Sequence, residues 1–181
     1  MHLLSDFSCV KDVSRMTLFS NCRRARMQLT RFSDFAFRVL MYAHAAEGRL
    51  VTIEELVRSY RVSRAHLMKV VNTLTRAGFL TAVRGRSGGV KLAKPATDIR
   101  LGDVVRATET DFAIVECFST GSQCVIDGCC RLPAVLRRAL GAFLLELDQH
   151  SVASIALKPK DFRIIFGEKA QQARQAGLRK L

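Results

Sequence analysis

The chain has 181 residues, of which 49% are hydrophobic, 25% are charged and 14 are Gly or Pro. This composition is typical of one globular domain, or of two small ones that share a core, and it excludes disordered, collagen-like and mucin-like proteins. No apolar run approaches the roughly 18 residues that a membrane-spanning helix needs, and polar or charged residues interrupt every apolar run of the first 26 residues. We therefore expect a cytoplasmic protein with no membrane segment and no signal peptide.

Positive charge is concentrated in the first half of the chain. Residues 1–100 hold 18 Lys and Arg against 7 Asp and Glu, whereas residues 101–181 hold 11 against 9. A half-chain this basic is typical of a protein that binds a polyanion, most often nucleic acid. A basic surface that is merely solvated is the alternative.

Four of the six cysteines lie within fourteen residues, at Cys117, Cys124, Cys129 and Cys130. Without a secretion signal, a disulfide scaffold is disfavoured, and close cysteines in a reducing compartment indicate a metal or cluster site.

The first helix is expected to follow a poorly ordered extension. Residues 1–26 lack periodicity and end in a basic run, and Met27 is a second possible start of translation. From Thr30, apolar residues recur at three- and four-residue spacing up to Gly48, which predicts a core helix. These residues are Phe32, Phe35, Val39, Leu40, Ala43 and Ala46.

A helix-turn-helix is predicted next. Residues 52–55 (TIEE) form a capping box that opens a short helix to about Tyr60, and Ser63 caps another helix that runs to Ala77 and is closed by Gly78. The apolar stripe of the second helix is Leu67, Val70, Val71, Leu74 and Ala77. The DNA-contacting candidates at the start or on the other face of this helix are Ser63, Arg64, Ala65, His66, Lys69, Asn72 and Arg76, with His66 as a phosphate contact.

A β-hairpin wing follows this helix. Residues 80–84 and 90–93 are predicted strands, joined by a turn at residues 85–89 (GRSGG). Arg84 and Arg86 at this turn suit a narrow minor groove, because a planar cation fits the concentrated negative potential there. The turn lacks the Gly-Lys-Ser/Thr ending of a nucleotide-binding loop, which excludes that function.

The rest of the chain predicts a short helix at about 101–109, a cysteine loop, and a long helix from Arg131 to about Gln149. Its apolar stripe is Leu132, Leu136, Leu140, Phe143, Leu144 and Leu147. This helix is too apolar for the few intrachain neighbours that so small a domain can provide. It is therefore expected to pack against its copy in a second subunit, which indicates a homodimer.

The predicted fold is mainly α with a small β-hairpin wing. We divide the chain into an extension (1–26), a winged helix-turn-helix domain (27–96), a linking helix with the cysteine loop (97–130), a dimerisation helix region (131–157) and a basic tail (158–181). No catalytic constellation is present, so we do not expect an enzyme.

The cysteine spacing leaves three kinds of site open. Structural zinc sites use pairs of Cys two to four residues apart, and this loop lacks two such pairs. Three thiolates on a long loop can instead surround an iron-sulfur cluster, with a fourth ligand from elsewhere. The spacing favours the cluster over zinc and over free or regulatory thiols.

Several motifs together resemble the NsrR family of nitric-oxide-sensing repressors, which belongs with the IscR regulators in the bacterial Rrf superfamily. The motifs are residues 27–34 (MQLTRFSD), 62–64 (VSR), 76–79 (RAGF), 82–89 (AVRGRSGG), 94–96 (KPA), 99–105 (IRLGDVV) and the cysteine loop ending at 130–132 (CRL). The resemblance covers about residues 27–157 and is specific because the motifs agree in order and spacing.

The resemblance implies a dimeric repressor of nitric oxide detoxification genes, which binds an inverted-repeat operator in double-stranded DNA and releases it when nitric oxide nitrosylates the cluster. By position, the ligands of one iron-sulfur cluster per subunit, 4Fe-4S in preference to 2Fe-2S, are Cys117, Cys124 and Cys130, with Asp34 donated by the other subunit. A carboxylate is a harder and weaker ligand than a thiolate, which leaves one iron open to attack. Cys129 is an extra cysteine, so the third thiolate is Cys129 or Cys130.

Three alternatives accompany this reading. An IscR-like or iron-responsive regulator shares the DNA-binding part, but IscR-like proteins use a loop His as a ligand, and no His lies between Cys117 and Cys130. A zinc-stabilised DNA-binding protein and a redox enzyme that uses the cluster are the others. Iron and sulfide analysis of anaerobically purified protein separates the cluster from zinc.

Overall fold

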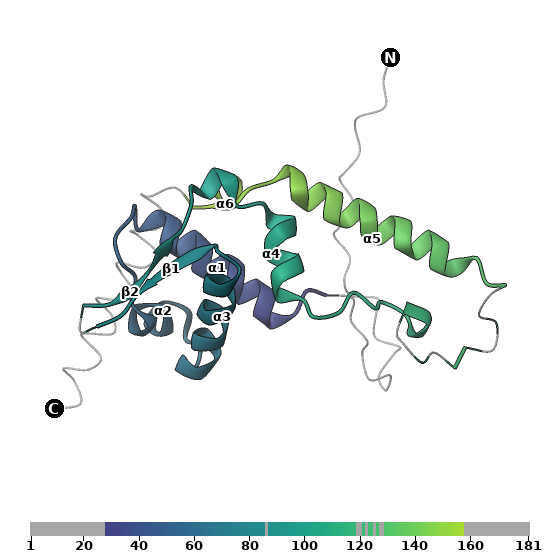
Figure 1. Cartoon of the computed structure of the whole chain (residues 1–181), viewed down its shortest axis with the longest axis horizontal. Helices are drawn as coiled ribbons and strands as arrows, with labels where there is room; N and C mark the ends of the chain where they lie inside the picture. Colours follow the sequence, from purple (N-terminus) through teal and green to yellow (C-terminus); the bar gives the residue numbers. More distant parts are fainter. Residues whose placement is uncertain are drawn as a thin grey trace, which may run out of the picture.

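The computed structural model describes residues 28–157 except residues 86, 119, 120, 122, 125, 127 and 128. A helical body carries a two-stranded hairpin on one side, and a long helix extends from the body on the other (Figure 1). The elements are α1 (Arg31–Ala45), α2 (Ile53–Tyr60), α3 (Arg64–Arg76), β1 (Leu80–Val83), β2 (Gly89–Leu92), η1 (Ala96–Asp98), α4 (Leu101–Thr108), η2 (Glu116–Phe118), α5 (Leu132–Gln149) and α6 (Val152–Ile155). The predicted fold class is confirmed, whereas the expectations for the extension and the basic tail fall outside the described residues.

Hydroxyl side chains fix where the first three helices begin. Thr30, Thr52 and Ser63 are the N-caps of α1, α2 and α3, and each side-chain oxygen accepts a hydrogen bond from the backbone N–H three residues later. Such a cap satisfies one of the N–H groups that the first helical turn leaves without a partner. The helix-turn-helix predicted from these residues is therefore present at the expected positions.

The turn between α2 and α3 is short because Arg61 adopts a left-handed conformation, with φ of 55°. Gly78 has φ of 75° and ends the α3 segment, a conformation that glycine adopts without steric cost. The two bends place α3 between α2 and the hairpin, with one face on α1.

The hairpin carries one more backbone pairing than predicted. β1 and β2 pair antiparallel, and Val51, just before α2, bridges to Val90 through two hydrogen bonds of 2.8 Å. A Cβ atom at Gly89 would lie 2.8 Å from the Val51 carbonyl oxygen, so only glycine fits beneath this bridge. The bridge fixes the base of the wing to the chain that enters the helix-turn-helix.

One apolar core lies between α1, α3, the hairpin and α4. Its largest fully buried side chains are Val39, Leu40, Val51, Leu56, Leu67, Val70, Leu74, Ile99, Val104 and Val152. The prediction that Ala77 belongs to the buried stripe of α3 is wrong. Ala77 follows the last helical residue as the C-cap and is exposed, because the chain already turns away from the core there.

Helix α5 confirms the predicted range but is not covered by the rest of the described chain. None of its residues is buried, and Leu132 and Val135 are 52% and 50% exposed. In Figure 1, the C-terminal end of α5 lies beside α4. From there α5 extends to the cysteine segment, the part of the chain between α4 and α5. Past α5, the chain returns to the body through backbone hydrogen bonds at residues 99–101 and through buried Val152 of α6, an element that the sequence did not predict. No described helix is long and apolar enough to span a bilayer.

Candidate functional site

The second helix of the helix-turn-helix, α3, presents a polar face to solvent. Leu67 and Leu74 are buried on one side, whereas the sequence-predicted contact residues lie exposed on the other. The exposed set comprises Ser63 at the N-cap and Arg64, Ala65, Lys69, Asn72 and Arg76 on the helix. This is the arrangement that a recognition helix needs, because its inner face holds the helix while its outer face is free for base edges and phosphates.

His66 differs from the other predicted contacts. Its ring lies edge-on to Phe32 and Phe35, with ring centroids 6.1 and 5.3 Å apart. The Nε2 atom is buried and has no hydrogen-bond partner in the described part of the chain. In this conformation the His66 ring packs α3 against α1 and does not lie on the exposed face.

The exposed face of α3 and the hairpin together form the candidate DNA-reading surface. Two arginines at the ends of this reading surface have different surroundings. Arg64 at the start of α3 forms an ion pair with Glu54 of α2, and both side chains are more than half exposed. Arg84 follows β1 and is exposed at the wing. A Cβ atom at Gly88 would clash with the Val83 carbonyl oxygen, which explains the glycine in this turn. Arg86 lies outside the described residues.

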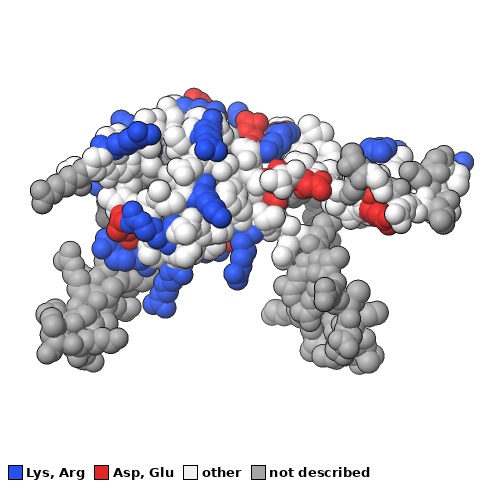
Figure 2. Space-filling model, turned by 60° about the horizontal axis from the view of Figure 1, so that its bottom comes forward, with Lys and Arg blue, Asp and Glu red and all other residues white. Residues whose placement is uncertain are grey.

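Basic side chains gather on this part of the molecule. Figure 2 shows many Lys and Arg side chains over the body that carries the helix-turn-helix and the hairpin, with fewer Asp and Glu among them and between the body and the far end. The basic first half of the chain thus places an excess of Lys and Arg on this face of the body. A basic surface around an exposed helix favours binding of the DNA backbone.

Sequence reasoning missed one exposed residue of α3. Met68 is 38% exposed, although its type is typical of a core. Because Leu67 takes the buried position beside it, Met68 is rotated by about 100° toward the polar face. The signal was available in the helical spacing, since Met68 is four residues from both Arg64 and Asn72.

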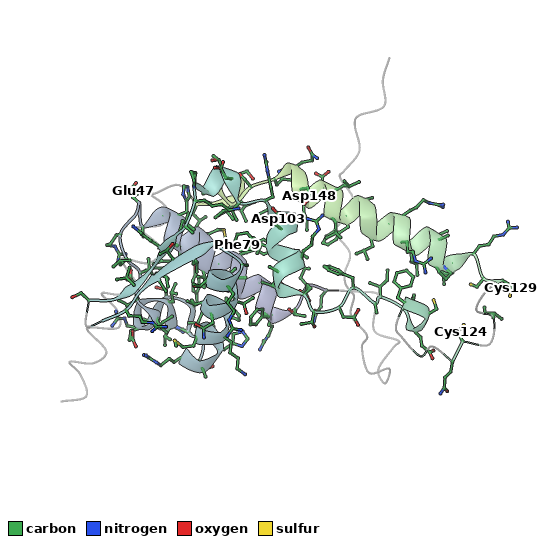
Figure 3. The ribbon with its side chains drawn as sticks, viewed as in Figure 1. Glu47, Phe79, Asp103, Cys124, Cys129 and Asp148 are labelled. Atoms are coloured by element: carbon green, nitrogen blue, oxygen red, sulfur yellow. The ribbon has the colours of Figure 1, made fainter. Side chains whose placement is uncertain are left out.

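The second part of the site is the cysteine segment between α4 and α5. Cys117 lies in η2, and the backbone N–H groups of Cys129 and Cys130 both donate to the carbonyl oxygen of Ile126, at 3.3 and 3.1 Å. Figure 3 places Cys124 and Cys129 near the start of α5, at the end of the molecule opposite the hairpin.

Aromatic packing holds part of this segment on α5. The Arg137 guanidinium lies 5.2 Å from the centre of the Phe118 ring, directly after Cys117. Cys117 and Cys130 are half-buried and Cys129 is exposed, each with a free thiol. Free thiols on one segment are the donor type that iron-sulfur clusters use, so the donor chemistry fits a cluster. Within the described residues, however, no three His, Cys, Asp or Glu side chains come together as a metal site.

Asp34 lies in the first turn of α1, where it pairs with Arg38 at 2.9 Å and stays about half exposed. This turn is tied to the end of α4. The Glu109 carboxylate accepts hydrogen bonds from the Thr30 backbone N–H at 2.8 Å and from the hydroxyl of buried Ser33. Glu109 is where the chain leaves α4 for the cysteine segment, so both predicted ligand regions share one attachment point.

Solved structures share this architecture. The structure is similar to CymR (YrzC), the global cysteine regulator of B. subtilis, with a TM-score of 0.58 and 17% identity over 72% of this chain and 97% of that one. The oxidized form of Staphylococcus aureus CymR gives a TM-score of 0.57 and 22% identity, covering 73% and 98% of the two chains. T. potens IscR gives 0.53 and 21%, covering 70% and 84%. These likenesses support the winged-helix fold.

A family model gives the assignment. The model of Rrf2, described as an iron-dependent transcriptional regulator, matches residues 29–158, which hold the helix-turn-helix, the wing, the cysteine segment and α5. The match spans well over half of the chain and includes both parts of the candidate site. The chain therefore belongs to the Rrf2 family of transcriptional regulators.

Proposed function

We propose that this Rrf2 regulator is a cytoplasmic, nitric-oxide-sensitive repressor that binds the operators of nitric oxide detoxification genes when an iron-sulfur cluster is in place. One observation carries the proposal: the chain joins an exposed basic recognition helix to a segment with four cysteines, and both lie within the family match. Membership in the family supports DNA binding and transcriptional regulation. The sensing chemistry rests on the cysteine segment and on the resemblance of the motifs.

DNA binding is assigned to α3 and the wing. Ser63, Arg64, Ala65, Lys69 and Asn72 are the major-groove contacts, because they are exposed on one side of a helix whose other side is buried. Arg84, and with it Arg86, reaches the minor groove from the hairpin. His66 serves as packing between α1 and α3 and not as a phosphate contact.

Dimerisation is assigned to α5. Four large apolar side chains of α5 remain exposed in the single chain, which is costly in water unless a partner covers them; they are Leu132, Val135, Phe143 and Leu145. A two-fold dimer formed through α5 carries two recognition helices. It therefore reads an inverted repeat with half-sites about one helical turn, or a multiple of it, apart.

The cluster ligands are Cys117, Cys124 and Cys130, with Asp34 from the partner subunit. A bound 4Fe-4S cluster, one per subunit, would supply iron that reacts with nitric oxide. Asp34 would supply a carboxylate, a weaker ligand than a thiolate, and Arg38 orients this carboxylate by its ion pair. Glu109 holds the start of α1, where Asp34 lies, against the end of α4.

The test is anaerobic purification followed by titration with nitric oxide. We expect brown protein with iron and sulfide, which binds an inverted-repeat operator and releases it in parallel with bleaching of its visible absorption. Cys129→Ala is the matched control and should behave as wild type. Colourless protein with stoichiometric zinc, or full operator affinity after bleaching, would contradict the proposal. Release by iron depletion but not by nitric oxide would favour an iron-responsive or IscR-like regulator.

A further inference from the structure

The polar face of α3 contains one exposed large apolar side chain, Met68, which is 38% exposed. The other exposed large apolar residues of the described chain lie on the hairpin, the cysteine segment, α5 and after α5. The dimer assignment explains those on α5. It does not explain Met68, because α3 is in the body that carries the reading surface (Figure 1).

The surroundings of Met68 follow from the helix spacing. Residues three and four apart are neighbours on a helix surface, so Met68 lies beside Arg64, Ala65 and Asn72. Ala65 and Met68 together form a small apolar spot, bordered by Arg64, Asn72 and Lys69. Polar and charged groups thus surround a surface that can make neither hydrogen bonds nor ion pairs.

The major groove offers one apolar feature that matches this spot. Of the four bases, only thymine presents a methyl group there, whereas the other edges carry hydrogen-bond donors and acceptors. A phosphate would gain nothing from a thioether. Met is unbranched and polarizable, so its side chain can adjust to a methyl group that lies against the groove-facing helix.

We propose that Met68, supported by Ala65, contacts the 5-methyl group of a thymine in each operator half-site and is a specificity-determining residue. This inference rests on the proposed DNA-binding function of α3. It assigns thymine to one base position of each half-site. The charges of the basic residues around Met68 cannot distinguish thymine from another base at that position.

The test compares thymine with deoxyuridine, which differs only by the methyl group. Duplexes are enriched from a random pool with wild-type protein, and each thymine of the enriched operator is then replaced by deoxyuridine. We expect about fourfold weaker binding at one position per half-site, which corresponds to the roughly 0.8 kcal/mol for burying one methylene-sized group. Replacement in both half-sites should weaken binding by about sixteenfold.

Variants assign the effect to the side chain. Met68→Ala should bind thymine and deoxyuridine operators equally, and Met68→Leu should keep the preference for thymine. Ile155→Ala, which removes a similarly exposed apolar side chain from α6 (39% exposed), is the matched control and should discriminate as wild type does. Thermal melting confirms that the variants fold, as expected for a surface position.

Two failures can be told apart. If no duplex is enriched, the DNA-binding function fails and this inference fails with it. If wild type binds its operator and loses affinity through Lys69→Ala, yet tolerates deoxyuridine at every position, the Met68 inference alone is overturned. It is also overturned if Met68→Ala still prefers thymine.

Discussion

Arg106 of α4 and Asp148 near the end of α5 form a two-pronged ion pair, in which both nitrogen–oxygen distances are 2.7 Å. The hydrogen bond from Arg106 lowers the pKa of Asp148, and the same bond raises the pKa of Arg106. Gly102 lies directly beneath, and a Cβ atom there would clash with the Asp148 carboxylate. The labelled residues of Figure 3 place Asp148 and Asp103 at this joint between the body and α5.

Gly102→Ala should disturb this joint. The added methyl group must displace the Asp148 carboxylate that Arg106 holds in place, so we expect a lower free energy of unfolding than in wild type, even though alanine is the better helix former. Denaturant titration measures it. Gly141→Ala is the control, because open space surrounds Gly141 in α5, and alanine there should hold or raise stability by up to about 1 kcal/mol. Equal stability of Gly102→Ala and wild type would refute the role of the joint.

Glu55 should make the stability of the helix-turn-helix depend on pH. Its carboxylate accepts hydrogen bonds from Tyr42 at 2.9 Å and from Arg49 at 2.6 Å. Burial acts to raise the pKa of Glu55, but the bonds from Arg49 and Tyr42 outweigh it and hold the pKa below its ordinary value of 4.5. A carboxylate with a lowered folded-state pKa adds stability that is present above the unfolded-state pKa and is lost as pH falls through the folded one.

Glu55→Gln should therefore lose about 1 to 2 kcal/mol at pH 7, because partial exposure reduces the roughly 1.5 to 3 kcal/mol that hydrogen bonds to a charged group contribute. The difference from wild type should shrink as pH falls below about 4.5. Urea unfolding at a series of pH values measures this. Exposed Glu47 provides the control substitution Glu47→Gln, and a difference that is constant from pH 7 to pH 3 would count against the argument.

Lys69→Ala and Arg84→Ala should weaken operator binding without unfolding the protein. A phosphate contact that is lost reduces the slope of log affinity against log salt by about one unit, whereas a lost base contact costs roughly 1 to 3 kcal/mol at one sequence position. Titrations at two salt concentrations separate the two. Arg138→Ala on α5 removes the same charge far from α3 and should leave the slope unchanged. Unchanged binding in both variants would remove α3 and the wing from the interface.

Phe143→Glu should separate the dimer. Phe143 belongs to the predicted apolar stripe of α5 and is 43% exposed in the single chain, so a carboxylate there would be buried without a partner on dimerisation. Light scattering at micromolar concentration should show a monomer, while Glu146→Gln on the same helix should remain dimeric. A wild-type protein that is a stable monomer at this concentration would contradict the dimer assignment.

The cysteine variants should not be equivalent. Cys117→Ala, Cys124→Ala and Cys130→Ala each remove a proposed thiolate and should abolish or strongly reduce iron and sulfide content, whereas Cys129→Ala should retain both. Asp34→Ala leaves three thiolates, so we expect a cluster that assembles but has an altered spectrum or stability. Visible absorption and iron analysis of the anaerobic proteins measure this. If Cys129→Ala loses iron and Cys130→Ala retains it, Cys129 is the third thiolate ligand and Cys130 is the extra cysteine.

Local signals made the DNA-binding half predictable. Thr52, Ser63 and Gly78 act within one turn of their own position, and hydroxyl caps and a left-handed glycine need no distant partner. The same reasoning failed for Ala77 and Met68, because a stripe drawn from residue type ignores where the helix ends and which neighbour already occupies the buried position.

Long-range pairs could not be predicted. Arg106 and Asp148 are 42 residues apart, and Thr30 and Glu109 are 79 apart, so no periodicity connects them. The cysteine segment is harder still, because its proposed ligands come from a loop and, by the resemblance, from a second chain. Spacing indicates candidate donor atoms there, but it does not determine the positions that a bound group would impose on them.

The length of α5 has a mechanical consequence. Its 18 residues make a rod about 27 Å long, attached to the body at the Arg106–Asp148 end. A tilt of about 10° at this attachment moves the opposite end, where the cysteine segment begins, by about 5 Å over such a rod. Conversely, a shift of that size among the cysteines corresponds to only a small rotation of the body. In a two-fold dimer both bodies rotate by the same angle about axes related by the symmetry, so the placement of the two α3 helices relative to each other changes.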